Sequence, residues 1–173
     1  MTTNHSVPEE IAGWFAGRIP DGWFTGPPEV TVDRDEILVV GDLADVALEE
    51  GATPAAISSG RSARAARFRD ETRGQRMRIA EEAEFRFGRK VSWGSRIGEL
   101  TVHYTTLSVP VMTRLRQSER TVLDTLVDGG VARSRSEALA WCVKLVGANQ
   151  AEWIAGLREA LTHVERVRAE GPR

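Results

Sequence analysis

The side chains that could carry out chemistry are few in this sequence and stand far apart. The three histidines, His5, His103 and His163, form no HxxxH or HxH pair, so the sequence predicts no metal site. The single cysteine, Cys142, falls on the apolar face of a predicted helix, where burial disfavours the reactive thiolate. No glycine-rich phosphate loop and no nucleophile-elbow pattern is present. We therefore expect no enzyme activity, no catalytic residue and no cofactor.

The composition is that of an ordinary soluble globular protein. The 173 residues are 41% hydrophobic and 28% charged, and the length fits one domain or two small ones. The longest aliphatic run, residues 37–40, is far shorter than the about 20 apolar residues of a membrane-spanning helix. Residues 1–10 have neither a basic patch nor an apolar core, so we expect no secretory signal. The sequence predicts a reduced, cytoplasmic protein with no membrane partner.

Charge is distributed unevenly along the chain. Residues 1–60 hold eleven Asp and Glu against two Arg, whereas residues 61–96 hold eleven Lys and Arg against five Asp and Glu. A basic block of this kind is typical of a chain that meets an anionic partner. An alternative fits the pattern equally well. In it, the basic helix forms salt bridges with the acidic segment of its own chain or of a second copy in a dimer. The acidic N-terminal region is the expected contact for a protein partner.

The first hundred residues predict a small α+β region. A helix over residues 8–19 is followed by a β-hairpin over residues 30–40. Residues 44–60 are rich in Ala, Gly and Ser, which predicts a short helix and then a linker. The proline-free residues 61–87 predict one long basic helix, and residues 91–104 predict a second hairpin. The expected fold class is therefore α+β.

The clearest pattern lies in residues 105–149. A short strand leads into a helix that ends at Gly129-Gly130, and a turn then leads into a second helix. Ser134 and Glu137 have the spacing of a capping box, which marks the start of that second helix. A lone strand leaves both of its edges unpaired, so we expect a dimer in which two copies of the strand pair antiparallel above four helices. Residues 150–173 add a last helix.

Two short runs in this part of the chain carry a family resemblance. They are LDTLVDGG at residues 123–130 and SRSEAL at residues 134–139, joined by a turn. With the preceding strand, they make residues 105–149, about a quarter of the chain, similar to a ribbon-helix-helix DNA-binding domain of the MetJ/Arc/CopG type. The remainder resembles no family that we recognise. The expected parts are an acidic α+β region, a basic helix with a hairpin, the ribbon-helix-helix segment and a C-terminal helix, at residues 1–58, 61–104, 105–149 and 150–173.

The resemblance implies a bacterial transcriptional regulator that dimerises through residues 105–149 and inserts its intermolecular ribbon into the major groove of double-stranded DNA. Outward side chains of the ribbon then contact bases, and the start of the second helix holds a phosphate. A strand over residues 105–111 turns Thr106 and Ser108 outward, whereas a later strand turns Met112 and Arg114 outward. We favour the earlier register, with a longer first helix. The expected base contacts are Thr106, Ser108 and Arg114, and the expected phosphate contacts are Arg116, Arg133, Ser134, Arg135 and Ser136.

The basic block extends the DNA contact that we expect. Its auxiliary surface consists of Arg61, Arg64, Arg69, Arg73, Arg76, Arg89, Lys90 and Arg96. A second hypothesis is open, because Thr106 and Ser108 discriminate weakly between bases and the isoelectric point is near 6.0. In it, the same fold is the dimerisation module of a protein-binding adaptor or an antitoxin-like protein that does not contact DNA. Polar residues on the outer face of the ribbon, within a positively charged surface, favour binding to DNA. An apolar or acidic surface around the ribbon favours binding to a protein.

Overall fold

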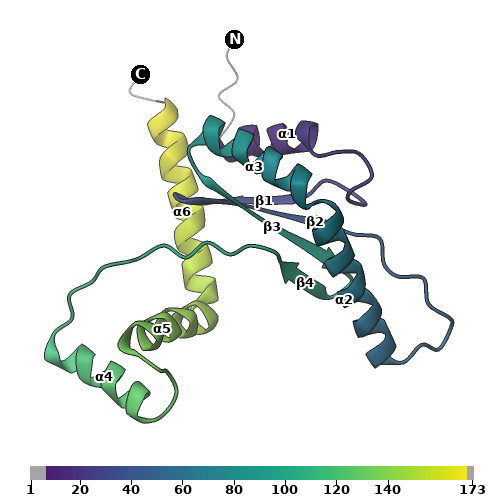
Figure 1. The fold of residues 1–173 in the computed structure, drawn as a ribbon. Helices are drawn as coiled ribbons and strands as arrows, with labels where there is room; N and C mark the ends of the chain where they lie inside the picture. The colour runs from purple at the N-terminus through teal and green to yellow at the C-terminus, as the bar shows by residue number, and fades with distance from the viewer. Residues whose placement is uncertain (1–6, 171–173) are drawn as a thin grey trace. The chain divides into compact units, whose positions relative to one another are not determined.

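The computed structural model describes residues 7–170, and within them it has six helices and one four-stranded sheet (Figure 1). The α+β fold class that the sequence predicts is confirmed. The chain divides into two compact units, residues 1–110 and residues 111–173. No helix in the described part of the chain is long and apolar enough to cross a membrane.

The N-terminal unit is built on a sheet with the strand order β1-β2-β3-β4. β1 (Glu29–Val32) pairs antiparallel with β2 (Glu36–Asp42), and β3 (Lys90–Ile97) pairs antiparallel with β4 (Leu100–His103). Both predicted hairpins are confirmed. β2 and β3 pair in parallel, and this pairing joins the two hairpins into one sheet.

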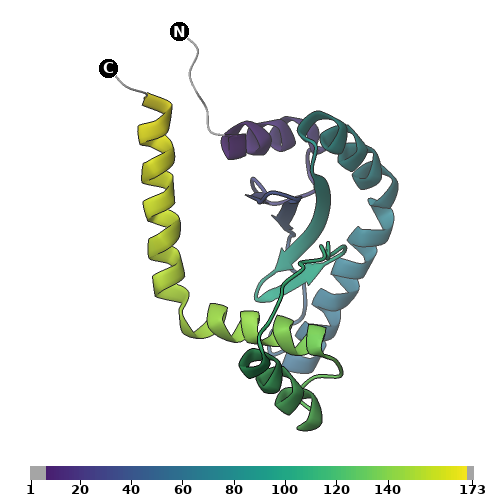
Figure 2. The same ribbon diagram turned by 90° about the vertical axis from the view of Figure 1, so that its left-hand side faces the viewer.

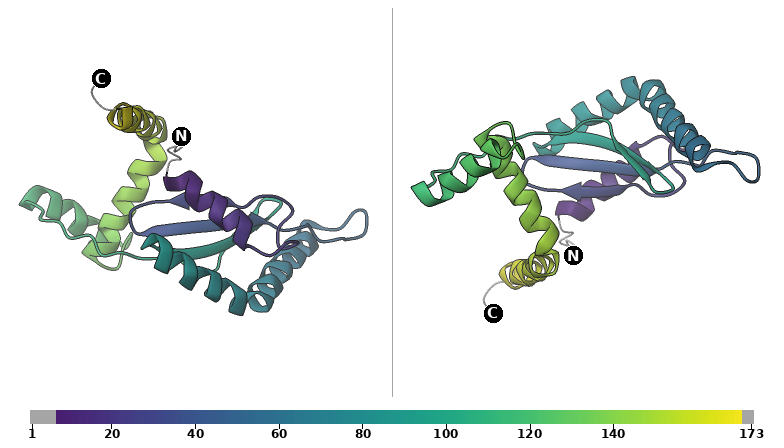
Figure 3. Two further views of the ribbon diagram at one scale, coloured as in Figure 1. Left: turned by 90° about the horizontal axis from the view of Figure 1, so that it is seen from above. Right: turned by 90° about the horizontal axis from the view of Figure 1, so that it is seen from below.

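Three helices pack on one face of this sheet. α1 (Val7–Arg18) crosses the strands, as the view from above in Figure 3 shows. α2 (Pro54–Glu71) begins after Thr53, whose hydroxyl accepts a hydrogen bond from a backbone N–H three residues later. α3 (Arg73–Phe87) ends at Gly88, whose φ of 66° lies in the left-handed region that favours glycine. Figure 2 shows the three helices in succession around the strands.

The core of the N-terminal unit lies between these helices and the two central strands. Phe15 of α1 is fully buried, and its ring meets that of Trp93 of β3 edge to face at 5.9 Å. The other buried residues of this cluster alternate along the strands or repeat along the helices; they are Ile11, Ile37, Val39, Ile79, Ala83, Val91 and Tyr104. The alternation explains why one face of each central strand is apolar.

The sequence predicts a short helix and then a linker in residues 44–60, but the structure has no helix before Pro54 in this segment, and the linker ends at Thr53. α2 begins at Pro54 because proline suits the first turn of a helix and Thr53 caps it. The expected boundary between residues 58 and 61 therefore falls inside a helix, and that division of the N-terminal region is wrong.

The single long helix expected over residues 61–87 is also divided, at Thr72. The side chain of Arg76 enters the bend, where its Nη2 donates to the Arg69 carbonyl at 2.6 Å and its Nε donates to the Thr72 hydroxyl at 2.9 Å. A side chain that takes over a backbone carbonyl in this way bends a helix.

The C-terminal unit consists of α4 (Gln117–Asp128), α5 (Arg135–Asn149) and α6 (Ala151–Glu170). The helices therefore follow one another in the order that the sequence predicts. A small core between α4 and α5 holds the buried residues Leu123, Ala132 and Ala138.

The strand expected over residues 105–111 is absent from the single chain. Residues 105–116 contain no regular secondary structure, and α4 begins at Gln117, so the longer first helix is wrong as well. The expected pairing partner of the strand is the same segment of a second copy, which a single chain does not supply.

Candidate nucleic-acid interface

The start of α5 is fixed by a capping arrangement. Ser134 has an extended backbone, with φ −155° and ψ 162°, and its hydroxyl accepts a hydrogen bond from the Glu137 N–H at 3.3 Å. The Glu137 carboxylate reaches back to the Arg133 N–H at 2.7 Å. The serine cap that the sequence predicts is confirmed, although the return bond ends one residue earlier than in the usual capping box. Because these bonds fix the first turn of α5, Arg133 and Arg135 lie beside the positive end of the helix dipole.

Two arginines flank this helix start, and each is paired with a carboxylate. Arg133 donates to Glu137 from Nε and Nη2 at 3.1 Å. Arg135 donates to Asp124 of α4 at 2.6 and 2.7 Å. These hydrogen bonds lower the pKa of both carboxyl groups. Because the Arg133 and Arg135 side chains are 92% and 58% exposed, both pairs are weak and can exchange partners.

The residues that precede α4 carry two further cations. Arg114 and Arg116 are exposed, and neither forms an ion pair within residues 7–170. Leu115, which lies between them, packs against the core of α4 and α5. Both guanidinium groups are therefore open to an anionic ligand, while the residue between them anchors the segment.

A cavity of about 340 Å³ opens beside this segment. Its walls include Leu115, Leu123 and Leu139, together with Arg135 and Ser136 from the first turn of α5. Arg135 and Ser136, two of the expected phosphate contacts, therefore line a cavity whose other walls are largely apolar.

The packing of Leu115 is compatible with the later of the two registers for the base contacts. Leu115 packs inward and α4 starts only at Gln117, which is compatible with a ribbon that ends just before α4 and turns Arg114 outward. Thr106 and Ser108 are also exposed, but they belong to the N-terminal unit, whereas Arg114 belongs to the C-terminal unit.

The C-terminal unit leaves much apolar surface uncovered in the single chain. Its exposed large hydrophobic residues far outnumber its buried ones; they are Val111, Met112, Val122, Val131, Trp141, Val143, Leu145, Val146, Trp153, Leu157, Leu161, Val164 and Val167. Apolar surface of this extent marks an interaction site on a soluble protein.

Much of the auxiliary basic surface is already neutralised within the N-terminal unit. The ion pairs are Arg61–Asp45, Lys90–Glu84 and Arg96 with both Glu29 and Asp42. Arg89 donates to the carbonyl oxygens of Asp33 and Phe87. The salt-bridged alternative that the charge pattern leaves open therefore describes Arg61 and Arg96, whose partners lie in the acidic residues 1–60. In the described part of the chain, the exposed Arg69 and Arg73 and the half-buried Arg64 form no ion pair.

Arg76 is a buried side chain, so its assignment to an exposed basic surface is wrong. It is only 6% exposed, and its guanidinium carbon lies 4.8 Å from the centre of the Tyr104 ring. The signal that could have found it is helical spacing, because Arg76 falls between Thr72 and Ile79 on the buried stripe of the bent helix.

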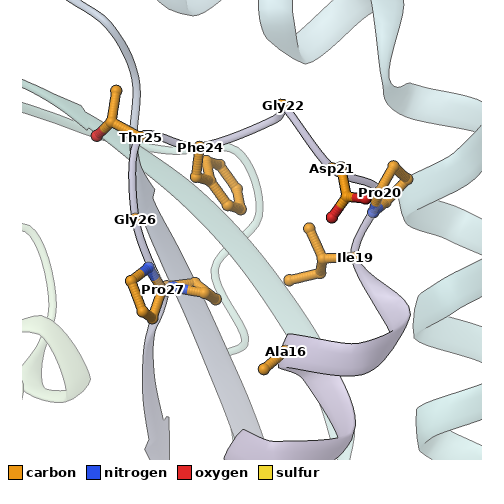
Figure 4. Close-up of a pocket in the computed structure, with 10 residues that line it drawn as sticks. Ala16, Ile19, Pro20, Asp21, Gly22, Phe24, Thr25, Gly26 and Pro27 are labelled. Atoms are coloured by element: carbon orange, nitrogen blue, oxygen red, sulfur yellow. The ribbon is translucent and has the colours of Figure 1, made fainter.

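A second cavity, of about 270 Å³, lies at the end of α1 (Figure 4). Its walls are largely apolar, with Ile19, Phe24 and Pro27 among them. The polar side chains are Asp21 and Thr25, and the Thr25 hydroxyl donates to the Asp42 carbonyl at 3.2 Å. Nowhere in residues 7–170 do three or more His, Cys, Asp or Glu gather as a metal site would require.

Known proteins match both units of the chain. Residues 9–103 match the family described as "Rv1265-like protein, N-terminal domain", and residues 116–168 match the "Mb1296 C-terminal domain". The chain belongs to the Rv1265-like family. It is 58% identical over 161 residues to the uncharacterised proteins Mb1296 of Mycobacterium bovis and Rv1265 of Mycobacterium tuberculosis, which covers 93% of this chain and 70% of each relative. No solved structure matches the chain significantly.

The two Rv1265-family matches fall on the two compact units, one on each. The stretch between them, residues 104–115, coincides with the connection that lacks regular secondary structure. The expected phosphate contacts at residues 116 and 133–136 therefore lie inside the C-terminal family domain, whereas the three expected base contacts lie outside both domains.

Proposed function

We propose that this Rv1265-family chain is a homodimeric DNA-binding protein that acts as a bacterial transcriptional regulator in the cytoplasm. The observation that carries the proposal is the start of α5, where Ser134 caps the helix and Arg133 and Arg135 flank it. In the proposed complex, the N–H groups of this turn and the two guanidinium groups hold one phosphate of the DNA backbone. Ser136 and Arg116 complete the phosphate contacts.

The proposed dimer covers the apolar surface of the C-terminal unit. A core of Leu123, Ala132 and Ala138 is too small to stabilise the unit by itself. In the dimer, residues 111–116 pair with the same residues of the second copy, which satisfies their backbone groups. The pairing also brings apolar residues of α5 from both copies together, so dimerisation and folding of this unit are coupled.

In the later register, Arg114 is the proposed base-reading residue. A guanidinium on the outer face of a ribbon donates two parallel hydrogen bonds to the O6 and N7 of guanine. Thr106 and Ser108 take this role only if the ribbon forms earlier in the chain. Arg64, where it lies near the duplex, adds sequence-independent affinity.

Binding to DNA over a range of salt concentrations tests the proposal. The full chain is titrated against a random-sequence duplex and against the duplex upstream of its own gene. We expect Arg135→Gln to weaken binding by about tenfold and to reduce the slope of log K against log salt by about 0.9, because one phosphate contact is lost. Arg158→Gln on α6, which removes the same charge from an exposed position, is the matched control. Wild-type protein whose affinity does not change with salt would contradict the proposal.

The exposed apolar residues favour a second candidate function. Val111 and Met112 are 84% and 95% exposed, and they line a cavity together with Arg135, which is already paired with Asp124. In this candidate, the same dimer presents its apolar residues to a protein partner as an adaptor or antitoxin-like module. A protein that dimerises in solution but binds neither duplex supports this candidate and excludes the first.

A further inference from the structure

Three arginines at the junction of α2 and α3 lack a carboxylate partner. Arg69 lies in the last turn of α2 and Arg73 begins α3, and both lie near enough to Arg76 to act on its charge. Among the side chains that the structure describes, none of the three forms an ion pair, although other arginines of these two helices do, such as Arg61 and Arg86. The junction is therefore a concentration of positive charge that the chain does not neutralise by contact.

Arg76 is held in one position by neutral groups. Its Nε donates to the Thr72 hydroxyl and its Nη2 donates to the Arg69 carbonyl. Its guanidinium lies over the ring of Tyr104, whose hydroxyl donates to the Ser95 hydroxyl at 2.5 Å. These contacts use the Nε–H and one N–H of Nη2, so both N–H groups of Nη1 remain as donors for a ligand.

The surroundings of Arg76 disfavour its own charge. Burial lowers its pKa, the neighbouring Arg69 and Arg73 lower it further, and Tyr104 and Asp70 act in the opposite direction. Asp70 attracts the guanidinium without contacting it. A buried cation beside two like charges is unfavourable unless an anion joins the group.

We propose that Arg69, Arg73 and the Nη1 of Arg76 form a binding site for one phosphate group. Planar guanidinium groups offer paired donors that match phosphate oxygens, and one guanidinium held by hydrogen bonds together with two exposed ones suits a tetrahedral anion. The phosphate belongs either to a nucleic-acid backbone or to a free phosphate compound. The site lies wholly in the N-terminal unit and does not depend on the ribbon.

The test uses the full chain with inorganic phosphate and pyrophosphate in calorimetric titrations, and with a random-sequence duplex in a fluorescence titration. Arg73→Gln and Arg69→Gln are compared with Arg78→Gln, which removes the same charge from another exposed position on α3. All three residues are exposed, so the substitutions leave the core unchanged. We expect the first two variants to bind the phosphate ligand about tenfold more weakly than Arg78→Gln and the wild type.

The outcomes separate the two sources of phosphate. Saturable binding of phosphate or pyrophosphate that only the cluster variants weaken supports a free phosphate compound, even if the chain binds no DNA. Loss of duplex affinity in the cluster variants alone, without binding of the small anions, supports the nucleic-acid backbone. If Arg73→Gln and Arg78→Gln behave alike towards every ligand, the proposal is overturned.

Discussion

Asp124 is the residue that competes most directly with a phosphate at the start of α5. It accepts two hydrogen bonds from Arg135, and those bonds lower its pKa, so it is ionised at neutral pH. A phosphate that binds Arg135 must replace this carboxylate and then lies close to a negative charge. The Asp124 carboxylate therefore orients the Arg135 side chain and at the same time lowers its affinity for phosphate.

Replacement of Asp124 by Asn should strengthen DNA binding. Asn keeps one acceptor for Arg135 but removes the charge that repels the backbone, so we expect an affinity increase of about three- to tenfold at low salt. The increase should shrink as salt rises. Asp128→Asn, at the exposed end of the same helix, is the control. An unchanged or weaker affinity in Asp124→Asn would argue against a phosphate at Arg135.

Gly41 of β2 is required by its contact with Phe24. A Cβ at this position would lie 2.2 Å from the Phe24 ring, so this partly buried ring, which also lines the cavity at the end of α1, would have to move. We expect Gly41→Ala to lower the free energy of unfolding by about 1–3 kcal/mol, measured by urea denaturation. Gly13→Ala, in α1 with open space around the new methyl group, should instead stabilise the protein by about 0.5–1 kcal/mol. Equal effects of the two substitutions would show that the Phe24 contact is unimportant.

At the scale of elements, the turn between β1 and β2 makes stability depend on pH. The Asp33 carboxylate accepts hydrogen bonds from the N–H groups of Asp35 and Glu36 at 2.8 and 2.7 Å, and these bonds lower its pKa. A group whose pKa is lower in the folded state stabilises the protein above its unfolded pKa, and that stabilisation is lost as the pH falls through the folded pKa.

We therefore expect wild-type stability to fall below about pH 4 more steeply than that of Asp33→Asn, since Asn keeps the acceptor oxygen but cannot titrate. Thermal unfolding between pH 2 and pH 7 measures the difference. Asp35→Asn, whose side chain does not form the turn bonds, should follow the wild-type curve. Parallel curves for wild type and Asp33→Asn would exclude this role of the turn.

Local patterns predicted the elements well and their pairing less well. Both hairpins follow from alternating apolar residues and turn residues, and the start of α5 follows from Ser134 and Glu137. The parallel pairing of β2 and β3 joins residues far apart in the sequence, so no local pattern indicates it. The bend at Thr72 was not predicted, although Gly74 lies two residues later, because it depends on hydrogen bonds of the Arg76 side chain to the Thr72 hydroxyl and the Arg69 carbonyl.

The candidate site was predictable where it depends on local capping and unpredictable where it depends on tertiary contacts. Ser134 caps α5 as the run of residues 134–137 predicts. The partners of Arg61 and Arg96 lie 16 or more residues away, so their neutralisation could not be derived from local spacing.

At the scale of the whole molecule, a dimer should make stability depend on protein concentration. If the apolar residues of α5 lie between two copies, the unfolding midpoint of the C-terminal unit rises with concentration. Leu145→Glu places a charge among these residues and should produce a monomer in which this unit is largely unfolded, as seen by analytical ultracentrifugation and circular dichroism. Lys144→Glu, at a position that is already charged and exposed, should remain a dimer. A concentration-independent monomer in the wild type would contradict the proposed assembly.

The parallel neighbours β2 and β3 also have a consequence during synthesis on the ribosome. β2 is complete at Asp42, but its partner begins only at Lys90, after the whole of α2 and α3 has been made. At bacterial rates of about 5–20 residues per second, the interval is about 2–10 seconds. Throughout it, Ile37 and Val39 of the nascent hairpin have no third strand beside them. The N-terminal hairpin is therefore the part of this chain most exposed to chaperones and to pairing with a neighbouring nascent chain.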